Sequence, residues 1–517
     1  MRTRTRVLAV IAGLAAASIA LSGCLYSMIP PETTPTKGVT ASPDTSGVSD
    51  DLLPYYGQHV EWTSCGQGFE CADIKVPLDW ENPSKADLKI AVIRHLAPSS
   101  SRIGSLVTNP GGPGESGVQF VRDGMSTAVD KTVENAYDVI GFDPRGVGAS
   151  TSVVCLDAKD MDSYLFDIPS GTRGSAAWDA QLKENNTRFA ESCDQNSKGI
   201  LQYITTENAA RDMDVLRAVL GESKLDYLGY SYGTMLGATY ANLYPERVGR
   251  FVLDGAVDPS VSSLQSGVTQ GIGFESALRA YMADCLKKSG CPFRGTVDDA
   301  MADLGTLLAS VDAKPLKNDD GRYLGADSLM TGIVAALYSQ DSWKYLTEAL
   351  KDVLAGDPNV AFQLADFYYN RTPEGKYTDN LFEAFNTYQC MDYPNDATQA
   401  EKDAAQAELK AKAPTIAPYW SNPDVSICDS WPYPATGKPG KIAANGAAPI
   451  VVIGTTNDPA TPYSWAVSLA DQLSSGVLVT RVGEGHTGYN KGNVCVDTAI
   501  DAYLIKGTVP KDGLHCG

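Results

Sequence analysis

One feature constrains the fold of this 517-residue chain more than any other, the pentapeptide Gly229-Tyr230-Ser231-Tyr232-Gly233. It has the pattern G-x-S-x-G and stands between a β-rich run at residues 225–228 and a helical pattern at residues 234–243. A serine on such a strand-to-helix turn projects its hydroxyl above the sheet, and the glycines remove side chains that would collide there. The following helix directs its N-terminus, which favours negative charge, at the same point. The setting predicts that Ser231 is a nucleophile; the alternative is a bare structural turn.

Strand-like and helix-like segments alternate along most of the chain, which predicts an α/β fold with a mostly parallel central sheet and helical crossovers. The β-rich runs outside the pentapeptide lie at residues 87–96, 104–108, 137–142, 251–253, 450–453 and 477–482. From residue 260 to 428 the alternation stops, and the pattern is mostly helical and dense in aromatic residues. We therefore expect an inserted helical cap at 260–428 between two core segments, 52–259 and 429–517.

A serine hydroxyl needs a base to take its proton, and the chain has only four histidines. His486 follows the last expected strand, and Asp458 is the only carboxylate in the turn after residues 450–453. This is the chain order serine, acid, histidine of α/β-hydrolases, in which a buried aspartate fixes the orientation of the imidazole. Asp254, after the strand at 251–253, is the competing acid. The alternative for His486 is a surface-loop histidine.

An oxyanion hole needs two backbone N–H groups. Tyr232, directly after the serine, would supply one of them. The loop Asn109-Pro110-Gly111-Gly112-Pro113-Gly114 would supply the other. Because proline has no N–H, Gly112 is the expected donor and Gly111 the reserve. The alternative is an ordinary Gly/Pro turn.

Six motifs occur in one order along the chain, namely NPGGPGESG, YDVIGFDPRGVGAS, DYLGYSYGT, FVLDGAVDP, NDPATP and GEGHTG. Each is weak alone, but together they resemble the secreted tripeptidyl aminopeptidases and their mycobacterial lipoprotein relatives, which are α/β-hydrolases related to proline iminopeptidase. The resemblance covers nearly the whole mature chain. It implies an α/β-hydrolase fold with a cap, and release of short peptides, commonly tripeptides, from free N-termini. It also implies activity on small esters in some members.

Two carboxylates are candidates for binding substrate. A free α-amine is cationic at neutral pH and requires a fixed carboxylate at the closed end of the cleft. Asp392, beside Cys390, resembles a recurrent Cys-x-Asp element of the family and is the expected anchor; a solvated surface aspartate is the alternative. Glu115 departs from the small residue that relatives more often carry after GGPG. We expect it either to alter substrate preference or to face solvent.

The N-terminus predicts export. Three arginines among the first six residues precede an apolar run at residues 7–21, as in a secretory signal, and the run is shorter than the about 20 residues that span a membrane. The following Leu21-Ser22-Gly23-Cys24 resembles the lipobox of bacterial lipoproteins. That resemblance implies cleavage before Cys24, lipidation of its sulfur, and anchoring to the membrane in the bacterial cell envelope, outside the cytoplasm. An ordinary signal is the alternative. We expect a signal peptide at 1–23 and a Pro/Ser/Thr/Gly-rich flexible tether at 24–51.

Cysteine usage and charge limit the possible partners. With Cys24 assigned to the lipid, ten cysteines remain, and proximity along an exported chain predicts five disulfides, Cys65 with Cys71, Cys155 with Cys193, Cys285 with Cys291, Cys390 with Cys428 and Cys495 with Cys516. Four scattered histidines and no paired CxxC argue against the rival interpretation, a metal site. We expect no metal and no cofactor.

The net charge bears on the possible partners. A net charge of −20 argues against nucleic acid as a partner, and the sequence does not set the oligomeric state.

Two further functional classes stay open beside a peptidase. A carboxylesterase or lipase acting on small or envelope-derived esters would use the same catalytic groups. A non-catalytic binding protein could also use a hydrolase scaffold. Haloalkane dehalogenases and epoxide hydrolases are excluded, because they would place an aspartate at position 231.

Overall fold

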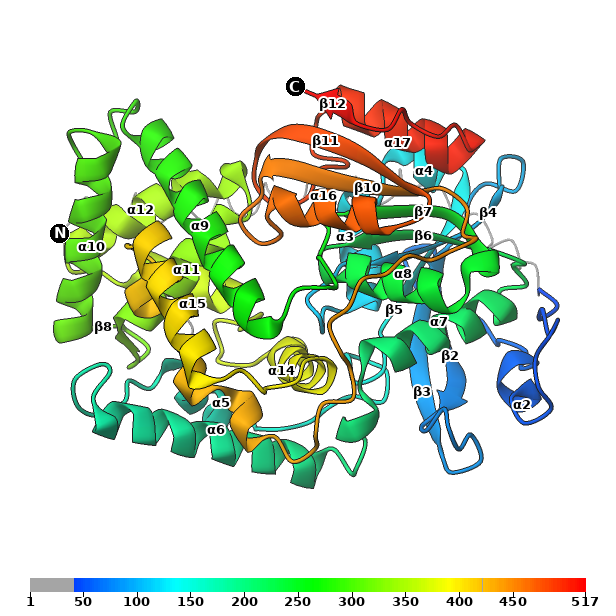
Figure 1. The fold of residues 1–517 in the computed structure, drawn as a ribbon, viewed down its shortest axis with the longest axis horizontal. Coiled ribbons are helices and arrows are strands. Elements are labelled where there is room, and N and C mark those ends of the chain that lie inside the picture. Colours follow the sequence, from blue (N-terminus) through cyan, green and yellow to red (C-terminus); the bar gives the residue numbers. More distant parts are fainter. Residues whose placement is uncertain (1–40, 421) are drawn as a thin grey trace, which may run out of the picture. The chain divides into compact units, whose positions relative to one another are not determined.

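The computed structural model describes residues 41–517, apart from residue 421 (Figure 1). The expected signal peptide, Cys24 and the first part of the expected tether therefore lie outside the described residues. Within the described part, no helix combines the length and the apolar character that a membrane crossing requires.

A ten-stranded sheet forms the centre of the described chain, in the order β1-β2-β3-β5-β4-β6-β7-β10-β11-β12. The first three strands and the β3–β5 pair are antiparallel, and every pair from β5 to β12 is parallel. This confirms the predicted α/β fold with its mostly parallel sheet. The strands are β1 (Thr63–Gly66), β2 (Phe69–Pro77), β3 (Asp87–His95), β4 (Gly104–Asn109), β5 (Tyr137–Phe142), β6 (Leu225–Tyr230), β7 (Val248–Asp254), β10 (Ile450–Asn457), β11 (Gly476–Glu484) and β12 (Leu514–Cys516).

Helices cover both faces of the sheet, because side chains along each buried strand alternate between the two sides. On β10, Ile450 and Val452 join one hydrophobic cluster, whereas Val451 and Ile453 join the other. The first cluster includes α2 (Leu53–Tyr56), α7 (Thr206–Val219), α8 (Tyr232–Leu243) and α16 (Tyr463–Gln472). The second includes α3 (Gly117–Ala128), α4 (Lys131–Glu134) and α17 (Val494–Lys506).

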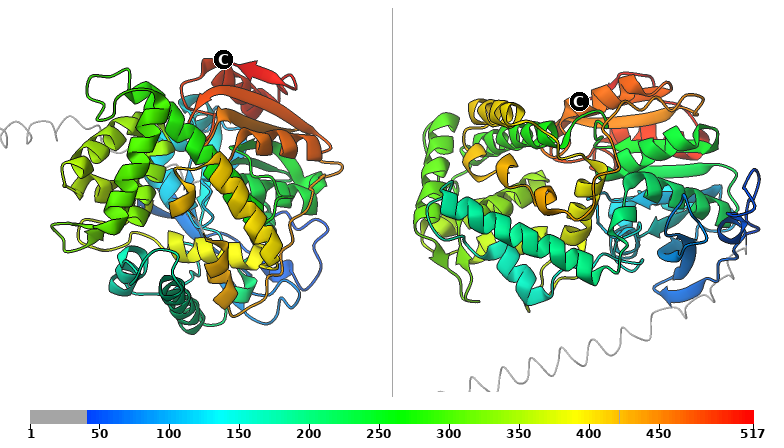
Figure 2. Two further views of the ribbon diagram at one scale, coloured as in Figure 1. Left: turned by 60° about the vertical axis from the view of Figure 1, so that its left-hand side comes forward. Right: turned by 60° about the horizontal axis from the view of Figure 1, so that its bottom comes forward.

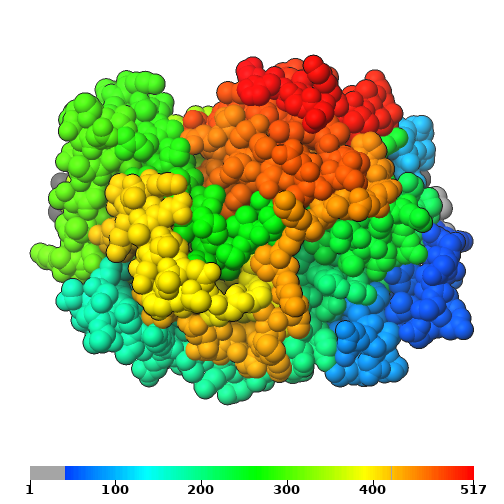
Figure 3. Space-filling model, in the orientation of Figure 1, coloured from blue at the N-terminus to red at the C-terminus, as the bar shows by residue number. Residues whose placement is uncertain are grey.

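Seven helices and a short hairpin lie in the region expected as the cap, and all of them except α14 contribute to a separate hydrophobic cluster, whereas α14 packs into the cluster of the core (Figures 1 and 2). They are α9 (Ser263–Cys285), α10 (Val297–Ala313), β8 (Leu316–Lys317), β9 (Tyr323–Leu324), α11 (Ala326–Leu337), α12 (Trp343–Leu354), α13 (Asn359–Tyr368), α14 (Leu381–Asp392) and α15 (Gln399–Lys412). After α15 the chain returns over the surface towards β10 (Figure 3).

Two helices from the range expected as core contact both the core and the cap. These are α5 (Ala158–Phe166) and α6 (Ala176–Asn196), drawn below the cap in Figure 1. Met161 of α5 and Phe189 of α6 belong to the same hydrophobic cluster as α7 and α8. Phe166 belongs to the hydrophobic cluster of the cap, and Asn186 Nδ2 donates to Val425 O at 2.8 Å. The two helices therefore link the core to the cap.

The last part of the expected tether is fixed to the core. Asp44 N donates to Ala218 O at 2.9 Å, and its carboxylate pairs with Arg217 at 2.9 Å. These contacts attach the chain to the C-terminal end of α7, so a free tether would end before residue 44.

The five disulfides predicted from proximity are all present. Cys390–Cys428 joins α14 to the short 3-10 helix η7 (Ile427–Ser430). Cys155–Cys193 joins the segment before α5 to the last turn of α6. Both bonds brace the part of the chain where cap and core meet.

Candidate active site

Ser231 occupies a strained turn between β6 and α8, with φ +55° and ψ −124°. A non-glycine residue at positive φ is uncommon and persists only where the surrounding structure holds it. Ser231 N donates to Asp254 O at 2.8 Å, and Thr234 Oγ1 donates to Ser231 O at 2.6 Å. A Cβ atom at Gly229 would clash with the backbone of Gly233. The two glycines of the motif are thus required for this turn.

Asp458 and His486 form a close pair. The imidazole Nδ1 lies 2.9 Å from both carboxylate oxygens of Asp458. The carboxylate is 2% exposed and also accepts from the backbone N–H groups of Ala460, Thr461 and Thr487 at 2.9–3.0 Å. These donors fix the carboxylate, and the carboxylate in turn fixes the ring and places the proton on Nδ1.

The competing acid, Asp254, contacts the backbone beyond the histidine. It accepts from Gly488 N at 2.8 Å and from Tyr489 N at 2.8 Å, and it makes no hydrogen bond to the His486 ring among the described residues. Burial raises the pKa of Asp254 to about 6, against the effect of these N–H donors. The geometry favours Asp458 as the partner of the imidazole and gives Asp254 a role in holding the His486 loop.

The other edge of the imidazole lies beside the serine turn. A Cβ atom at Gly255 would stand 3.1 Å from His486 Cε1, and the preceding residue, Asp254, binds Ser231 N. His486 Nε2 is buried without a hydrogen-bond partner among the described residues. The imidazole thus lies beside Gly255, the residue after the one that binds Ser231 N, and a proton transfer from Ser231 to His486 stays a prediction.

The glycine-rich loop after β4 touches the serine turn. A Cβ atom at Gly111 would lie 2.9 Å from Ser231 Cβ, so only glycine allows this approach. Gly111 N already donates to Asn109 Oδ1 at 3.1 Å. The N–H groups of Gly112 and Tyr232 donate to no acceptor within residues 41–517 apart from residue 421. The expected oxyanion donors Gly112 and Tyr232 thus have unoccupied N–H groups within the described residues, whereas the N–H of Gly111 is already bound, and the role of the pair stays a prediction.

The cap reaches the base through Tyr338, a contact that the sequence reasoning missed. Tyr338 O accepts from His486 N at 2.8 Å, and the two rings meet edge to face with centroids 5.4 Å apart. Thr461 was also missed, although its place three residues after Asp458 is a usual one for a capping hydroxyl. Thr461 Oγ1 lies 3.1 Å from Asp458 Oδ2 and 3.3 Å from His486 Nδ1.

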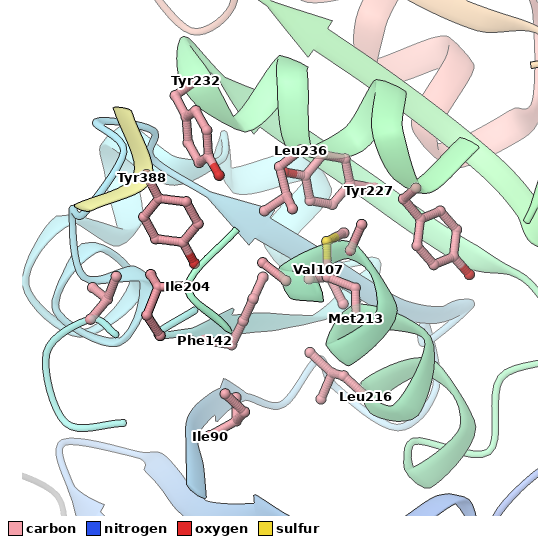
Figure 4. Close-up of a cluster of buried hydrophobic side chains, with 14 of the residues drawn as sticks. Ile90, Val107, Phe142, Ile204, Met213, Leu216, Tyr227, Tyr232, Leu236 and Tyr388 are labelled. Atoms are coloured by element: carbon pink, nitrogen blue, oxygen red, sulfur yellow. The ribbon is translucent and has the colours of Figure 1, made fainter. Parts of the chain in front are cut away.

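Asp392 lies apart from the serine and the histidine. It is buried, and its oxygens accept from Thr206 N at 2.9 Å and Thr206 Oγ1 at 2.6 Å. The same hydroxyl lies 2.6 Å from Tyr232 OH, whose ring points into the hydrophobic cluster with Tyr388 (Figure 4). Burial raises the pKa of Asp392 to about 7. It lines a groove that contains neither Ser231 nor His486. Each Asp392 oxygen accepts one bond from Thr206 and keeps further acceptor capacity, so its role in binding a substrate amine stays a prediction.

Glu115 stands at the end of the glycine-rich loop. It is exposed to solvent. Desolvation by the neighbouring protein raises the pKa of Glu115 to about 7, and the nearby His486 lowers it in part. Of the two carboxylates that the sequence singled out for substrate, Glu115 is the one that shares its surroundings with the histidine.

The pH dependence of activity should report the environment of His486. Burial lowers the pKa of this histidine, but the Asp458 charge and hydrogen bond, with Asp254 and Glu115, outweigh burial and raise it above 6.5. Protonated imidazole cannot take the serine proton, so kcat/KM should fall as pH drops through this raised pKa. The Glu115 charge contributes to this raised pKa, so protonation of Glu115 would affect the acid side of the profile. The pH dependence of kcat/KM for ester hydrolysis measures this pKa. A midpoint below pH 6.5 would contradict the pairing of His486 with Asp458.

Comparison with known proteins identifies the family. Residues 413–516 match the family model described as "TAP-like protein". Serine protease Hip1 of Mycobacterium tuberculosis is 35% identical over 99% of this chain and 98% of its own length. Carboxylesterase B of the same species is 35% identical over 96% of both chains. Tripeptidyl aminopeptidase of Streptomyces lividans is 30% identical over 88% of this chain and 86% of its own. The chain therefore belongs to the tripeptidyl aminopeptidase-like family of α/β-hydrolases.

Proposed function

We propose that this chain is a serine exopeptidase that releases short peptides, chiefly tripeptides, from free N-termini. The observation that carries the proposal is the Asp458–His486 pair at 2.9 Å, held beside the strained turn of Ser231. The likeness to Hip1 and to the tripeptidyl aminopeptidase supports a peptidase.

The mechanism is acyl transfer. Ser231 Oγ attacks the scissile carbonyl carbon while His486 Nε2 takes the hydroxyl proton. The N–H groups of Gly112 and Tyr232 bind the oxyanion, and His486 then gives its proton to the leaving amine. Water, deprotonated by His486, attacks the acyl-enzyme, and the peptide acid leaves as Ser231 recovers its proton. No cofactor takes part in these steps.

The N-terminal sequence supports an extracytoplasmic place for the enzyme. The basic and apolar signal pattern at 1–23 and the lipobox-like residues before Cys24 favour a lipid anchor in the bacterial cell envelope. Five disulfides fit an oxidising compartment. The proposed partners are thus a peptide substrate and the membrane that holds the lipid.

An esterase is the second candidate, because carboxylesterase B is as similar in sequence as Hip1. A serine, a histidine and an aspartate hydrolyse esters and amides by the same steps, so the catalytic groups alone do not separate the two. What separates them is whether the site uses the substrate's amine.

The deciding experiment compares tripeptide anilides with a free and with an acetylated N-terminus, together with mass spectrometry on a mixed peptide pool. An exopeptidase should hydrolyse the free form at least about tenfold faster in kcat/KM, because an unpaired binding carboxylate is costly. The pool should lose residues in steps of three from the N-terminus. Equal rates on both anilides, or cleavage only of esters, would favour the esterase.

A further inference from the structure

Tyr232, one of the two expected oxyanion donors, cannot be fixed by a hydrogen bond from its own N–H group. That group has to stay free for the oxyanion, so other contacts of the residue must set its direction. The residue before it, Ser231, is strained at φ +55°, and such a conformation persists only where the surrounding structure holds it. The direction of the Tyr232 N–H therefore depends on what holds the Tyr232 side chain.

A chain of hydrogen bonds anchors the far end of that side chain. Tyr232 OH lies 2.6 Å from Thr206 Oγ1, which donates to Asp392 Oδ2 at 2.6 Å. A hydroxyl has one proton to donate, so the threonine that donates to the carboxylate accepts from the phenol. Thr206 N also donates to Asp392 Oδ1 at 2.9 Å and thereby fixes the threonine. The Asp392 carboxylate is thus the final acceptor of a directed chain that begins at Tyr232.

All three residues of this chain are buried, with at most 9% of each exposed. In such surroundings hydrogen bonds polarise one another, and a group left without its partner is costly. The Tyr232 ring also meets the Tyr388 ring, with centroids 5.7 Å apart (Figure 4). The Tyr232 side chain is therefore held at two points, the ring by packing and the hydroxyl by hydrogen bonding.

Asp392 ends α14, a helix of the cap region whose other end reaches the second expected oxyanion donor. A Cβ atom at Gly112 would lie 3.4 Å from Leu381 Cδ1 in the first turn of α14. A Cβ atom at Gly114 would lie 2.8 Å from Leu381 O. The first turn of the helix thus packs on the glycine-rich loop, and its last turns hold the side chain of Tyr232. One helix contacts the segments that carry both donors.

We propose that Asp392 is a positioning residue, which directs the Tyr232 N–H towards the oxyanion by way of Thr206. In this role Asp392 does not touch the substrate; its charge orders the hydroxyl chain, and the chain holds the residue that follows the nucleophile. The role rests on the proposed acyl-transfer mechanism, but not on the choice between peptide and ester substrates. An anchor for the substrate amine, expected from the sequence, is the competing role for Asp392.

Three substitutions interrupt the chain at different points. Thr206→Val replaces the hydroxyl with a methyl group, Tyr232→Phe removes only the phenol hydroxyl, and Asp392→Asn leaves one acceptor oxygen for two donors. Substrates are a chromogenic ester, a tripeptide anilide with a free amine, and its acetylated form. Each change should lower kcat by about 10- to 100-fold on all three substrates with KM within about threefold, because a displaced donor stabilises the transition state less. Thr206→Ser, which keeps the hydroxyl, should stay within about threefold of the wild-type kcat.

A second tyrosine–threonine pair provides the matched control. Tyr281 OH lies 3.0 Å from Thr347 Oγ1 between α9 and α12 of the cap. Thr347→Val loses the same kind of hydrogen bond and should keep the wild-type kcat. Fluorophosphonate titration counts the active sites, so unfolded enzyme does not enter these values.

A peptidyl trifluoromethyl ketone gives a readout that a loss of stability alone does not change. Its tetrahedral adduct with the serine places a negative oxygen where the oxyanion forms. The Ki of this inhibitor should therefore rise in Thr206→Val and Asp392→Asn in proportion to their fall in kcat/KM. It should stay at the wild-type value in Thr347→Val.

Three results would overturn the assignment. A loss confined to KM on the free-amine anilide would make Asp392 the amine anchor instead. Unchanged kcat per titrated site in Asp392→Asn and Tyr232→Phe would leave the chain a structural role only, and an equal loss in Thr347→Val would show that the effect is not specific. If the wild type hydrolyses the ester but not the anilides, the exopeptidase proposal is wrong, and the ester rates still decide the role of Asp392.

Discussion

Ser231→Ala is expected to lower kcat by about 10⁴- to 10⁶-fold on both esters and peptides, because no other atom in the proposed mechanism can carry the acyl group. Alanine keeps the Cβ atom of serine, and the backbone bond from Ser231 N to Asp254 O does not involve the hydroxyl. The fold should therefore survive. Turnover of a chromogenic ester and of a tripeptide anilide measures the loss, and mass spectrometry should show the fluorophosphonate adduct on Ser231 in the wild type only.

Ser100→Ala is the matched control for this change, because Ser100 is an exposed loop serine far along the chain from the motif. It should keep full activity and full labelling. An adduct that persists in Ser231→Ala, or turnover within about tenfold of the wild type, would show that the nucleophile is another group.

Asp458→Asn and Asp254→Asn should have different consequences, because the two carboxylates hold different groups. Asparagine at 458 would lose the ionised acceptor for His486 Nδ1 and allow the wrong tautomer, so kcat should fall by about 10³- to 10⁴-fold with little change in stability. Asparagine at 254 would replace one acceptor oxygen with an NH2 group, so the hydrogen bond from Gly488 N or from Tyr489 N would be lost. That change should cost about 1–3 kcal/mol in the free energy of unfolding and reduce kcat by less than about tenfold.

Chemical denaturation and steady-state kinetics on the two purified variants distinguish these outcomes. The acid limb of the Asp458→Asn profile should also move to lower pH, since Asp458 raises the His486 pKa. A larger loss of kcat in Asp254→Asn than in Asp458→Asn would exchange the two assignments.

The features that could be predicted from the sequence are those that depend on residues close together in the chain. The serine turn was foreseeable because glycines at 229 and 233 are needed within one short segment, and they stand against each other in the structure. The central strands were foreseeable from their apolar runs. The strand β2, which lies between the edge strand β1 and β3, was missed, because its mixed polar and apolar residues form a partly exposed part of the sheet.

What the sequence could not give depended on contacts between distant segments. Tyr338 meets His486 from the cap, and nothing near either residue signals the other. Asp392 was expected to bind a substrate, and its two hydrogen bonds with Thr206, 186 positions away, could not be foreseen. The packing of α5 and α6 between core and cap likewise follows from burial of distant side chains, such as Phe189 in the core cluster and Phe166 in the cap cluster. Spacing along the chain carries no information about such partners.

The bond from His486 N to Tyr338 O has a consequence for how peptides arrive. A movement of the cap that carried α11 away would break this hydrogen bond and free the backbone at His486. An enzyme with the cap displaced in this way is therefore expected to be less active. If this hydrogen bond is kept during turnover, we expect substrate to enter without displacement of α11, and such a route would favour thin, unfolded chain ends over folded proteins.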